Sequence, residues 1–214
     1  MKKYFLTVAV LCSMVVVGCS IFHDKTSDLE REGQRLFASC DHLGVDDVAT
    51  IRAGEFVCKG ARINPFHGSK PSANNRSCGD CHQPGINFSL TPTRVAKLAA
   101  DHPVFFDGLD EDLDRLKADA LVHVLAPGVD EFRQSPKLIH LRDLCDAYGN
   151  CDGLGLGGDR VENLNAFIIQ AIGNHMSATT ARVAGVDFRV PNAQELKAIN
   201  AYMRSRLVAD QDER

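Results

Sequence analysis

Apolar residues recur at the spacing of one helical face in five stretches of this chain, and no stretch shows the strict alternation of a half-buried strand. We expect helices over residues 28–38, 92–100, 110–126, 160–174 and 193–207. The segments 39–76 and 128–157 are interrupted by Gly, Pro and Asn and are expected to be irregular. The pattern therefore predicts a mostly α fold with long irregular loops.

Several of these helices have recognisable start signals. Ser27 and Asn192 each have a Glu three residues later, the arrangement of an N-terminal cap. Pro92 after Thr91 suits a first helical position, because proline lacks only an N–H that would be unpaired there. These signals support helices that begin near residues 28, 92 and 193.

The expected helix over residues 110–126 depends on charge and apolar spacing. Its first turn is acidic, which complements the helix dipole. Its apolar stripe consists of Leu113, Leu116, Ala120, Leu121 and Val124. Pro127 and Gly128 are expected to end it.

The N-terminal segment has the features of a bacterial secretory signal. Lys2 and Lys3 precede an apolar run over residues 4–17 that is too short for a membrane span. Val16-Val17-Gly18-Cys19 resembles the lipobox of bacterial lipoproteins, so residues 1–18 would be removed and Cys19 acylated. Ser20 after the cysteine resembles outer-membrane sorting. The alternative is ordinary signal cleavage near Ser20, with Cys19 discarded.

This interpretation divides the chain into a signal peptide (1–18), a tether (19–27) and one domain (28–214), on the periplasmic side of a bacterial envelope. A hydrophobic content of 44% is ordinary for a globular protein. Removal of Lys2 and Lys3 leaves 22 basic and 28 acidic side chains, a net charge of −6. Such an acidic chain is not expected to bind nucleic acid.

Eight cysteines make the composition informative for an exported chain. Outside the N-terminal segment and the motif described next, the cysteines are Cys40, Cys58, Cys145 and Cys151. An even number in an exported protein suggests disulfides, and the nearest neighbours pair Cys40 with Cys58 and Cys145 with Cys151. Free buried thiols are the alternative for the first pair.

Residues 78–82 read Cys78-Gly79-Asp80-Cys81-His82, the C-x-x-C-H signature of covalent haem attachment. Two thiols three positions apart on a turn can both reach the vinyl groups on one edge of a porphyrin. The imidazole next to them then lies under the ring and binds the iron. The motif predicts one haem c, held through Cys78 and Cys81, with His82 as proximal ligand.

Two other interpretations of this motif compete. A structural zinc site needs four Cys or His ligands, and the sequence has neither a second C-x-x-C nor an H-x-x-x-H. A thioredoxin-like redox pair needs a strand–helix unit beside the cysteines, and no such pattern surrounds residues 78–82. Export, spacing and the helical surroundings favour haem.

The sixth iron ligand of an electron-transfer haem is usually Met or His. Met203 falls on the apolar stripe of the last helix and is expected to be core. His175 and Met176 end the preceding helix, each on one face with apolar residues, and the helical pattern does not separate them. His140 is an outside candidate.

The chain resembles bacterial c-type cytochromes, in particular the haem domain of exported cytochromes related to di-haem proteins. The similar stretches are residues 74–82, 87–92, 171–175 and 181–191. The resemblance implies a cytochrome c-like helical domain around one covalent haem, and it favours His175 as distal ligand, with Met176 as alternative. Gly33, Phe37 and Tyr202 resemble the helix crossing of that fold. A second C-x-x-C-H is absent.

Three functions follow as expectations. The first is electron transfer to a redox partner protein, with iron closed at its sixth position. The second is a haem peroxidase or oxidase-like enzyme, in which His140 or Glu131 would be the acid–base group. The third is a haem sensor or haem subunit of an envelope redox complex. Haem with axial-ligand candidates and no catalytic constellation favours the electron carrier. The acidic charge suggests a basic partner surface.

Overall fold

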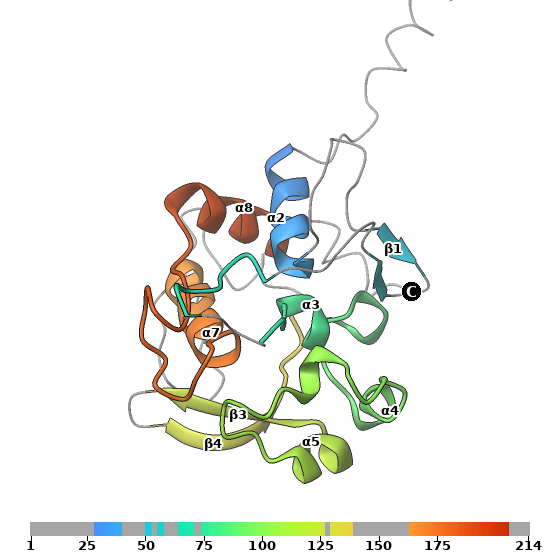
Figure 1. Ribbon diagram of the computed structural model, residues 1–214. Coiled ribbons are helices and arrows are strands. Elements are labelled where there is room, and N and C mark those ends of the chain that lie inside the picture. Colours follow the sequence, from blue (N-terminus) through green and yellow to red (C-terminus); the bar gives the residue numbers. More distant parts are fainter. Residues whose placement is uncertain are drawn as a thin grey trace, which may run out of the picture.

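The structure is a computed structural model that describes residues 28–39, 50–52, 55–57, 64–70, 74–126, 129–138 and 163–205. In chain order, its elements are α2 (Asp28–Ala38), β1 (Thr50–Arg52), β2 (Glu55–Val57), α3 (Cys78–Cys81), η1 (Pro84–Ile86), α4 (Pro92–Val95), η2 (Pro103–Phe105), α5 (Leu113–Asp119), β3 (Leu121–Ala126), β4 (Val129–Gln134), α7 (Leu164–His175) and α8 (Ala193–Met203). The prediction of a mostly helical fold with long loops is confirmed. In Figure 1, α3 lies at the centre, between the crossing helices α2 and α8 and the hairpin β3–β4.

The helices α2 and α8 cross in close contact, and Gly33 makes this possible. A Cβ added to Gly33 would come within 2.6 Å of the Ala198 carbonyl carbon and 2.7 Å of Tyr202 Cβ. Phe37, one turn further along α2, meets the Tyr202 ring edge-on at 5.3 Å. The expectation that Gly33 lets the first and last helices approach closely is therefore confirmed.

The main hydrophobic core fills the space between α2, α7 and α8. Its fully buried members include Leu36, Phe37, Phe66, Phe88, Leu164, Ile172, Ile199 and Tyr202. Cys78 of α3 packs against the edge of this core. The core therefore fixes the position of the short helix that carries the C-x-x-C-H motif.

A second cluster lies under α4, α5 and β3. It contains Leu90, Val95, Val104, Leu116, Ala120 and Val122, and Cys81 packs against it. The two cysteines of α3 therefore touch different clusters. The motif sits at the junction between them.

The expected helix over residues 110–126 is wrong in its second half. α5 ends at Asp119 because Ala120 takes the left-handed conformation, with φ of 56°. Residues 121–126 then form β3, paired antiparallel with β4 from Leu121↔Gln134 to Ala126↔Val129. The β-branched Val122 and Val124 alternate with His123, as in a strand, while Leu121 and Val124 continue the helical spacing of the preceding residues, so this short run is compatible with both.

The hairpin also corrects the expectation of no strands and of irregular structure from residue 128 onward. His123 and Phe132 face each other across it, with stacked rings 4.8 Å apart. Cross-strand aromatic pairs of this kind stabilise antiparallel strands. A second, shorter hairpin pairs β1 with β2.

The other boundaries differ by a few residues. α4 begins at Pro92, with Thr91 Oγ1 accepting from Arg94 N at 3.3 Å, but it ends at Val95 rather than at residue 100. The backbone continues there with tighter bonds, from Lys97 N to Arg94 O and from Leu98 N to Val95 O. α7 begins at Leu164, and α8 has the expected capping box of Asn192 and Glu195.

Several predictions concern residues outside the described part of the chain. These are the signal segment 1–18, the tether 19–27 with Cys19, the four cysteines Cys40, Cys58, Cys145 and Cys151, and His140. Among the residues that are described, no helix is both long enough and apolar enough to cross a membrane.

Candidate functional site

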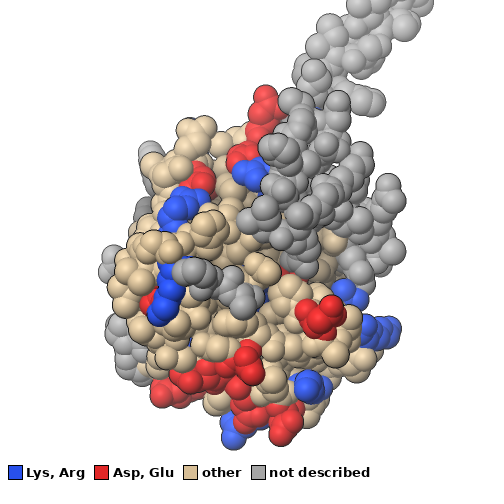
Figure 2. All heavy atoms as spheres, viewed as in Figure 1, with Lys and Arg blue, Asp and Glu red and all other residues tan. Residues whose placement is uncertain are grey.

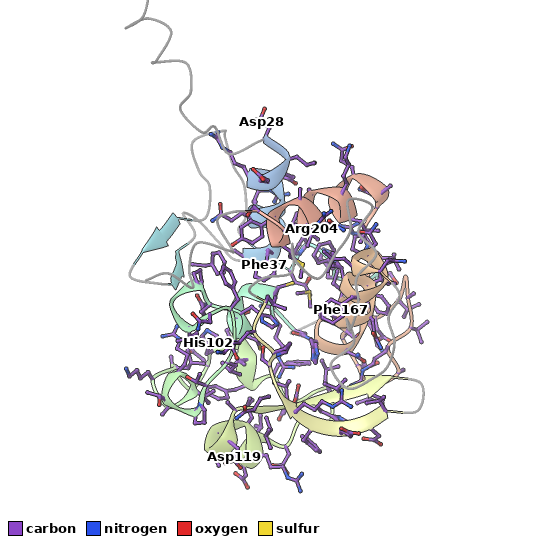
Figure 3. All side chains as sticks on the ribbon, turned by 180° about the vertical axis from the view of Figure 1, so that it is seen from behind. Asp28, Phe37, His102, Asp119, Phe167 and Arg204 are labelled. Carbon is purple, nitrogen blue, oxygen red and sulfur yellow. The ribbon has the colours of Figure 1, made fainter. Side chains whose placement is uncertain are left out.

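A pocket of about 770 Å³, measured with the part open to solvent, lies between α3, α7, α8 and the hairpin β3–β4. Its apolar lining residues are Phe37, Cys78, Cys81, Val122, Val124, Pro136, Leu138, Phe167, Ile168, Ala171, Met176, Ile199 and Met203. Its polar lining residues are Ser77, His82, Gln134, Ser135 and His175. Figure 3 shows Phe37 at the end of α2 and Phe167 on α7, two of the elements that surround it.

The structure brings together all five of the residues predicted to contact the haem. Cys78, Cys81 and His82 line the pocket from α3 and the residue after it. His175 and Met176 line the same pocket from the end of α7. Met203, expected to be core, is 4% exposed and lines the same pocket. Glu131, the acid–base alternative, is not a lining residue: its side chain is 59% exposed and bonds to Arg133 at 2.8 Å.

Cys78 and Cys81 are the first and last residues of the four-residue helix α3, and both have free thiols. Burial raises the pKa of each thiol from 9.0 to about 12. For Cys81, the nearby positive charge of Arg76 acts in the opposite direction, but burial outweighs it. Both groups are therefore neutral thiols at the edge of an apolar pocket.

Asp80, between the two cysteines, fixes the start of α3. Its Oδ2 accepts from the backbone N–H of Ser77 at 2.7 Å and from Ser77 Oγ at 3.0 Å. The Asp80 side chain is fully buried and lies 3.6 Å from His102 Nε2. A carboxylate at this position satisfies N–H groups that the first turn leaves unpaired. It thereby stabilises the first turn of the helix that carries both thiols.

The imidazole of His82 has a defined orientation. Nδ1 lies 2.6 Å from the Phe88 carbonyl oxygen, which can only accept, so Nδ1 carries the proton. Nε2 then carries the lone pair, and the Ser135 hydroxyl lies 3.3 Å from it. A backbone carbonyl that holds one ring nitrogen in this way leaves the other free to bind a metal.

Burial also keeps His82 neutral. It lowers the pKa of the imidazole from 6.5 to about 4, although bonds to the Phe88 and Pro136 carbonyls act in the opposite direction. A neutral imidazole is the form that coordinates metal ions. His82 is therefore in its metal-binding form across the neutral range.

His175 faces the pocket from the last residue of α7 and is also neutral. Burial is the main cause that lowers its pKa from 6.5 to about 3, and the positive charge of Arg76 adds to the effect. Met176, the C-cap residue of α7, is 3% exposed and lines the pocket beside His175. The end of α7 thus offers a second neutral imidazole and a thioether.

Arg76, two residues before Cys78, ties the motif to the second cluster. Its guanidinium forms a buried ion pair with Glu111 at 2.7 Å, with exposed side-chain fractions of 4% and 1%. It also donates to the carbonyls of Pro103, Val104 and Phe106. Because these donors are all used within the fold, Arg76 acts as an anchor for the haem-motif segment.

The donor set fits a covalently attached haem. The two free thiols are three residues apart, a neutral imidazole follows them with its Nδ1 already bonded, and most of the lining is apolar. Among the described residues, no group of three or more Cys, His, Asp or Glu side chains is placed to hold a metal ion.

Sequence reasoning missed four contributors to this site. They are Ser135 beside His82, the Phe88 carbonyl, and the buried amides of Asn64 and Asn74. Ser135 and the Phe88 carbonyl carry no sequence signal that marks a role. Asn74 lies in the segment 39–76, which we expected only to be irregular, and it also belongs to residues 74–82, which carry the cytochrome resemblance.

No family model, curated protein or solved structure matches this chain.

Proposed function

We propose that this chain is a mono-haem c-type cytochrome that transfers electrons in the bacterial cell envelope. The observation that carries the proposal is the meeting of Cys78, Cys81 and His82 with His175 and Met176 in the walls of one apolar pocket. Chain segments some 90 residues apart supply these two groups. Such a convergence of two thiols and two kinds of axial ligand matches the needs of a six-coordinate haem c.

In this proposal, each residue has a distinct role. Cys78 and Cys81 would hold the porphyrin through thioethers, and His82 Nε2 would bind the iron while the Phe88 carbonyl accepts the hydrogen bond from Nδ1. The bound haem supplies the one-electron chemistry, which the polypeptide does not perform itself. The apolar side chains of α7, α8 and β3 exclude water from the site.

We propose His175 as the sixth ligand, with Met176 as the alternative. Its neutral imidazole lines the pocket, and its pKa of about 3 keeps the nitrogen lone pair free. The resemblance of residues 171–191 to exported cytochromes favours the same choice. A protein ligand at this position closes the iron to small molecules, which suits an electron carrier better than a peroxidase.

The proposal includes export and a lipid anchor at Cys19, which would hold the domain at the outer membrane on its periplasmic side. The partner would be a redox protein with a basic docking surface. Acidic side chains gather over α5 and β4 in Figure 2, and they include Asp114, Asp119, Asp130 and Glu131. Gln134, at the end of β4, lines the pocket, so a partner docked on β4 would lie close to the pocket.

Expression of the full chain in a bacterium that attaches haem to c-type cytochromes tests the proposal. The mature polypeptide should keep one haem after denaturation, seen as added mass and as Soret absorption. The double variant Cys78→Ala/Cys81→Ala should lack it, whereas Cys145→Ala, outside the motif, should keep it. A mature wild-type chain with the mass of bare polypeptide and no Soret band would overturn the proposal.

The electron-transfer part has its own measurement. The purified protein should show a low-spin spectrum in both oxidation states and should not respond to carbon monoxide or cyanide. Rapid reaction with peroxide by a high-spin species would instead support the enzyme alternative.

A further inference from the structure

Three successive backbone carbonyls at the end of α7, those of residues 175–177, are bound by two buried side-chain amides. Asn74 Nδ2 donates to His175 O at 3.0 Å and to Ser177 O at 2.8 Å. Asn64 Nδ2 donates to Met176 O at 3.2 Å. The last carbonyls of a helix have no partner within the helix, so these amides complete the end of α7.

The two amides are oriented by further bonds. Asn74 Oδ1 accepts from Arg76 N at 3.0 Å, so its NH₂ group must face α7. Asn64 Nδ2 also donates to the Asn74 carbonyl at 3.2 Å, and Asn64 Oδ1 accepts from Phe66 N at 2.9 Å. The exposed fractions of Asn74 and Asn64 are 0% and 2%. Buried amides with several hydrogen bonds act as rigid connectors.

The connection joins the two halves of the proposed haem site. Asn74 lies four residues before Cys78, on the segment that carries both thioether cysteines and the proximal ligand. The carbonyls that it holds belong to the segment with His175 and Met176. Asn74 therefore links the backbone of the cysteine segment directly to the backbone of the proposed sixth ligand.

We propose that Asn74, supported by Asn64, is the positioning residue for the sixth iron ligand. The inference rests on the proposed function, because it assumes a haem at Cys78 and Cys81. The amides hold the backbone of residues 175–177 in a fixed position relative to the C-x-x-C-H segment, from which the ligand side chain would reach a bound haem without rearrangement of α7.

The end of α7 does not depend on these amides for its helical bonds. Met176 N donates to Ile172 O at 2.9 Å, and Ser177 Oγ donates to Gly173 O at 2.6 Å. Loss of the Asn74 amide should therefore shift the end of α7 without unfolding it. This difference separates positioning from a merely structural role.

Asn74→Asp tests the proposal, because it keeps the shape and replaces the NH₂ donor with an oxygen that faces two carbonyls. We expect the folded haem protein to show a high-spin component and to bind carbon monoxide, which wild type does not, because the loss of two hydrogen bonds releases the backbone of the sixth ligand. Added imidazole should restore the low-spin spectrum, because the porphyrin and His82 stay in place.

Asn64→Ala is the second variant, with a smaller expected effect in the same direction, and it covers the case in which Asn74→Asp does not fold. Asn165→Asp is the matched control: it lies on the exposed face of α7, where Asn165 Oδ1 accepts from Asn200 Nδ2. It should leave spin state and carbon monoxide binding unchanged.

The outcomes separate this proposal from the one before it. If wild type carries a low-spin haem and both variants keep its spin state and its lack of carbon monoxide binding while only losing stability, the positioning role is wrong and the cytochrome stands. If wild type carries haem whose sixth position is open, the positioning role is also wrong. If wild type carries no haem at all, both proposals fail.

Discussion

Gly33 of α2 lies directly against the backbone of Ala198 in α8, with no space for a side chain between the two helices. The nearest atoms to an added Cβ are the carbonyl of Ala198 and Tyr202 Cβ, none of which is the flexible end of a side chain. The crossing can therefore admit a methyl group only if one helix moves. Because Phe37 and Ile199 on these helices line the pocket, such a movement would also reach the candidate site.

Gly33→Ala should lower the free energy of unfolding by about 1–3 kcal/mol, the usual cost of an added group in a packed core. Urea unfolding, monitored by circular dichroism, measures this change in the free energy of unfolding. Gly173→Ala is the matched control, because the added Cβ there meets only the tip of the Phe188 ring, at 3.2 Å. Alanine also favours a helix over glycine, so the control should be closer to neutral. Equal losses in both variants would contradict the crossing argument.

His175→Ala should convert the proposed haem from low to high spin and open it to carbon monoxide. Met176→Ala should leave the haem low spin, because the imidazole still reaches the iron. Optical spectra of oxidised and reduced protein distinguish the two. A far-red methionine–iron charge-transfer band that disappears in Met176→Ala and persists in His175→Ala would reverse the assignment.

Glu111→Ala should lower the free energy of unfolding by about 3–5 kcal/mol, because it leaves the buried Arg76 guanidinium without its counter-ion. The backbone N–H of His123, which donates to Glu111 Oε2 at 2.9 Å, loses its acceptor as well. Denaturant unfolding gives the value. Glu131→Ala, at an exposed position of β4, should change stability by less than about 1 kcal/mol. A loss at Glu111 as small as this would show that the buried pair is not an anchor.

Asp187 should make the fold sensitive to acid. Its carboxylate accepts from Val183 N and Thr179 Oγ1, both at 2.9 Å, and lies 3.4 Å from Lys70 Nζ. The backbone bond from Val183 is the main cause that holds the pKa of Asp187 below its usual 3.8, although burial acts in the opposite direction. A carboxyl with a lowered pKa stabilises the fold above its unfolded pKa and loses this contribution as the pH falls through the folded pKa.

The difference in unfolding midpoint between wild type and Asp187→Asn should therefore be largest at neutral pH and should shrink as the pH falls below about 4. Urea titrations at several pH values measure it. Asp101→Asn, at an exposed position, removes one carboxylate without touching this loop. A difference that stays constant from pH 7 to pH 2 would show that Asp187 acts through shape and not through charge.

Local signals predicted the elements of this fold that have clear caps and one apolar face. α2 and the start of α8 agree with the predictions, because caps and stripes act within a few residues. The error over residues 110–126 has a physical cause: the short run Val122-His123-Val124 suits both a helix and a strand, and its partner β4 decides between them. Ala120 in the left-handed region gives no warning, since glycine is the residue expected there.

The candidate site also contains residues that local spacing predicted and residues that it did not. Cys78, Cys81 and His82 form one turn, so their spacing alone predicted that they lie together at one site. His175 lies 93 residues beyond His82, and only the resemblance to known cytochromes singled it out. The Asn74–His175 bond spans 101 residues, and no pattern along the chain marks such a contact. Long-range partners of this kind are decided by packing of the whole domain.

Most of the pocket lining around the two thiols comes from parts of the chain that are made after them. Val122 and Leu138 lie more than 40 residues beyond Cys78, and Phe167 and Met203 lie further still. During synthesis the motif therefore emerges before most of the segments that later surround it. Once the later segments have packed around it, burial leaves a thiol with a pKa near 12, about one in 10⁵ ionised at pH 7. In the proposed cytochrome, covalent loading before the domain closes would therefore meet more accessible thiols than loading afterwards.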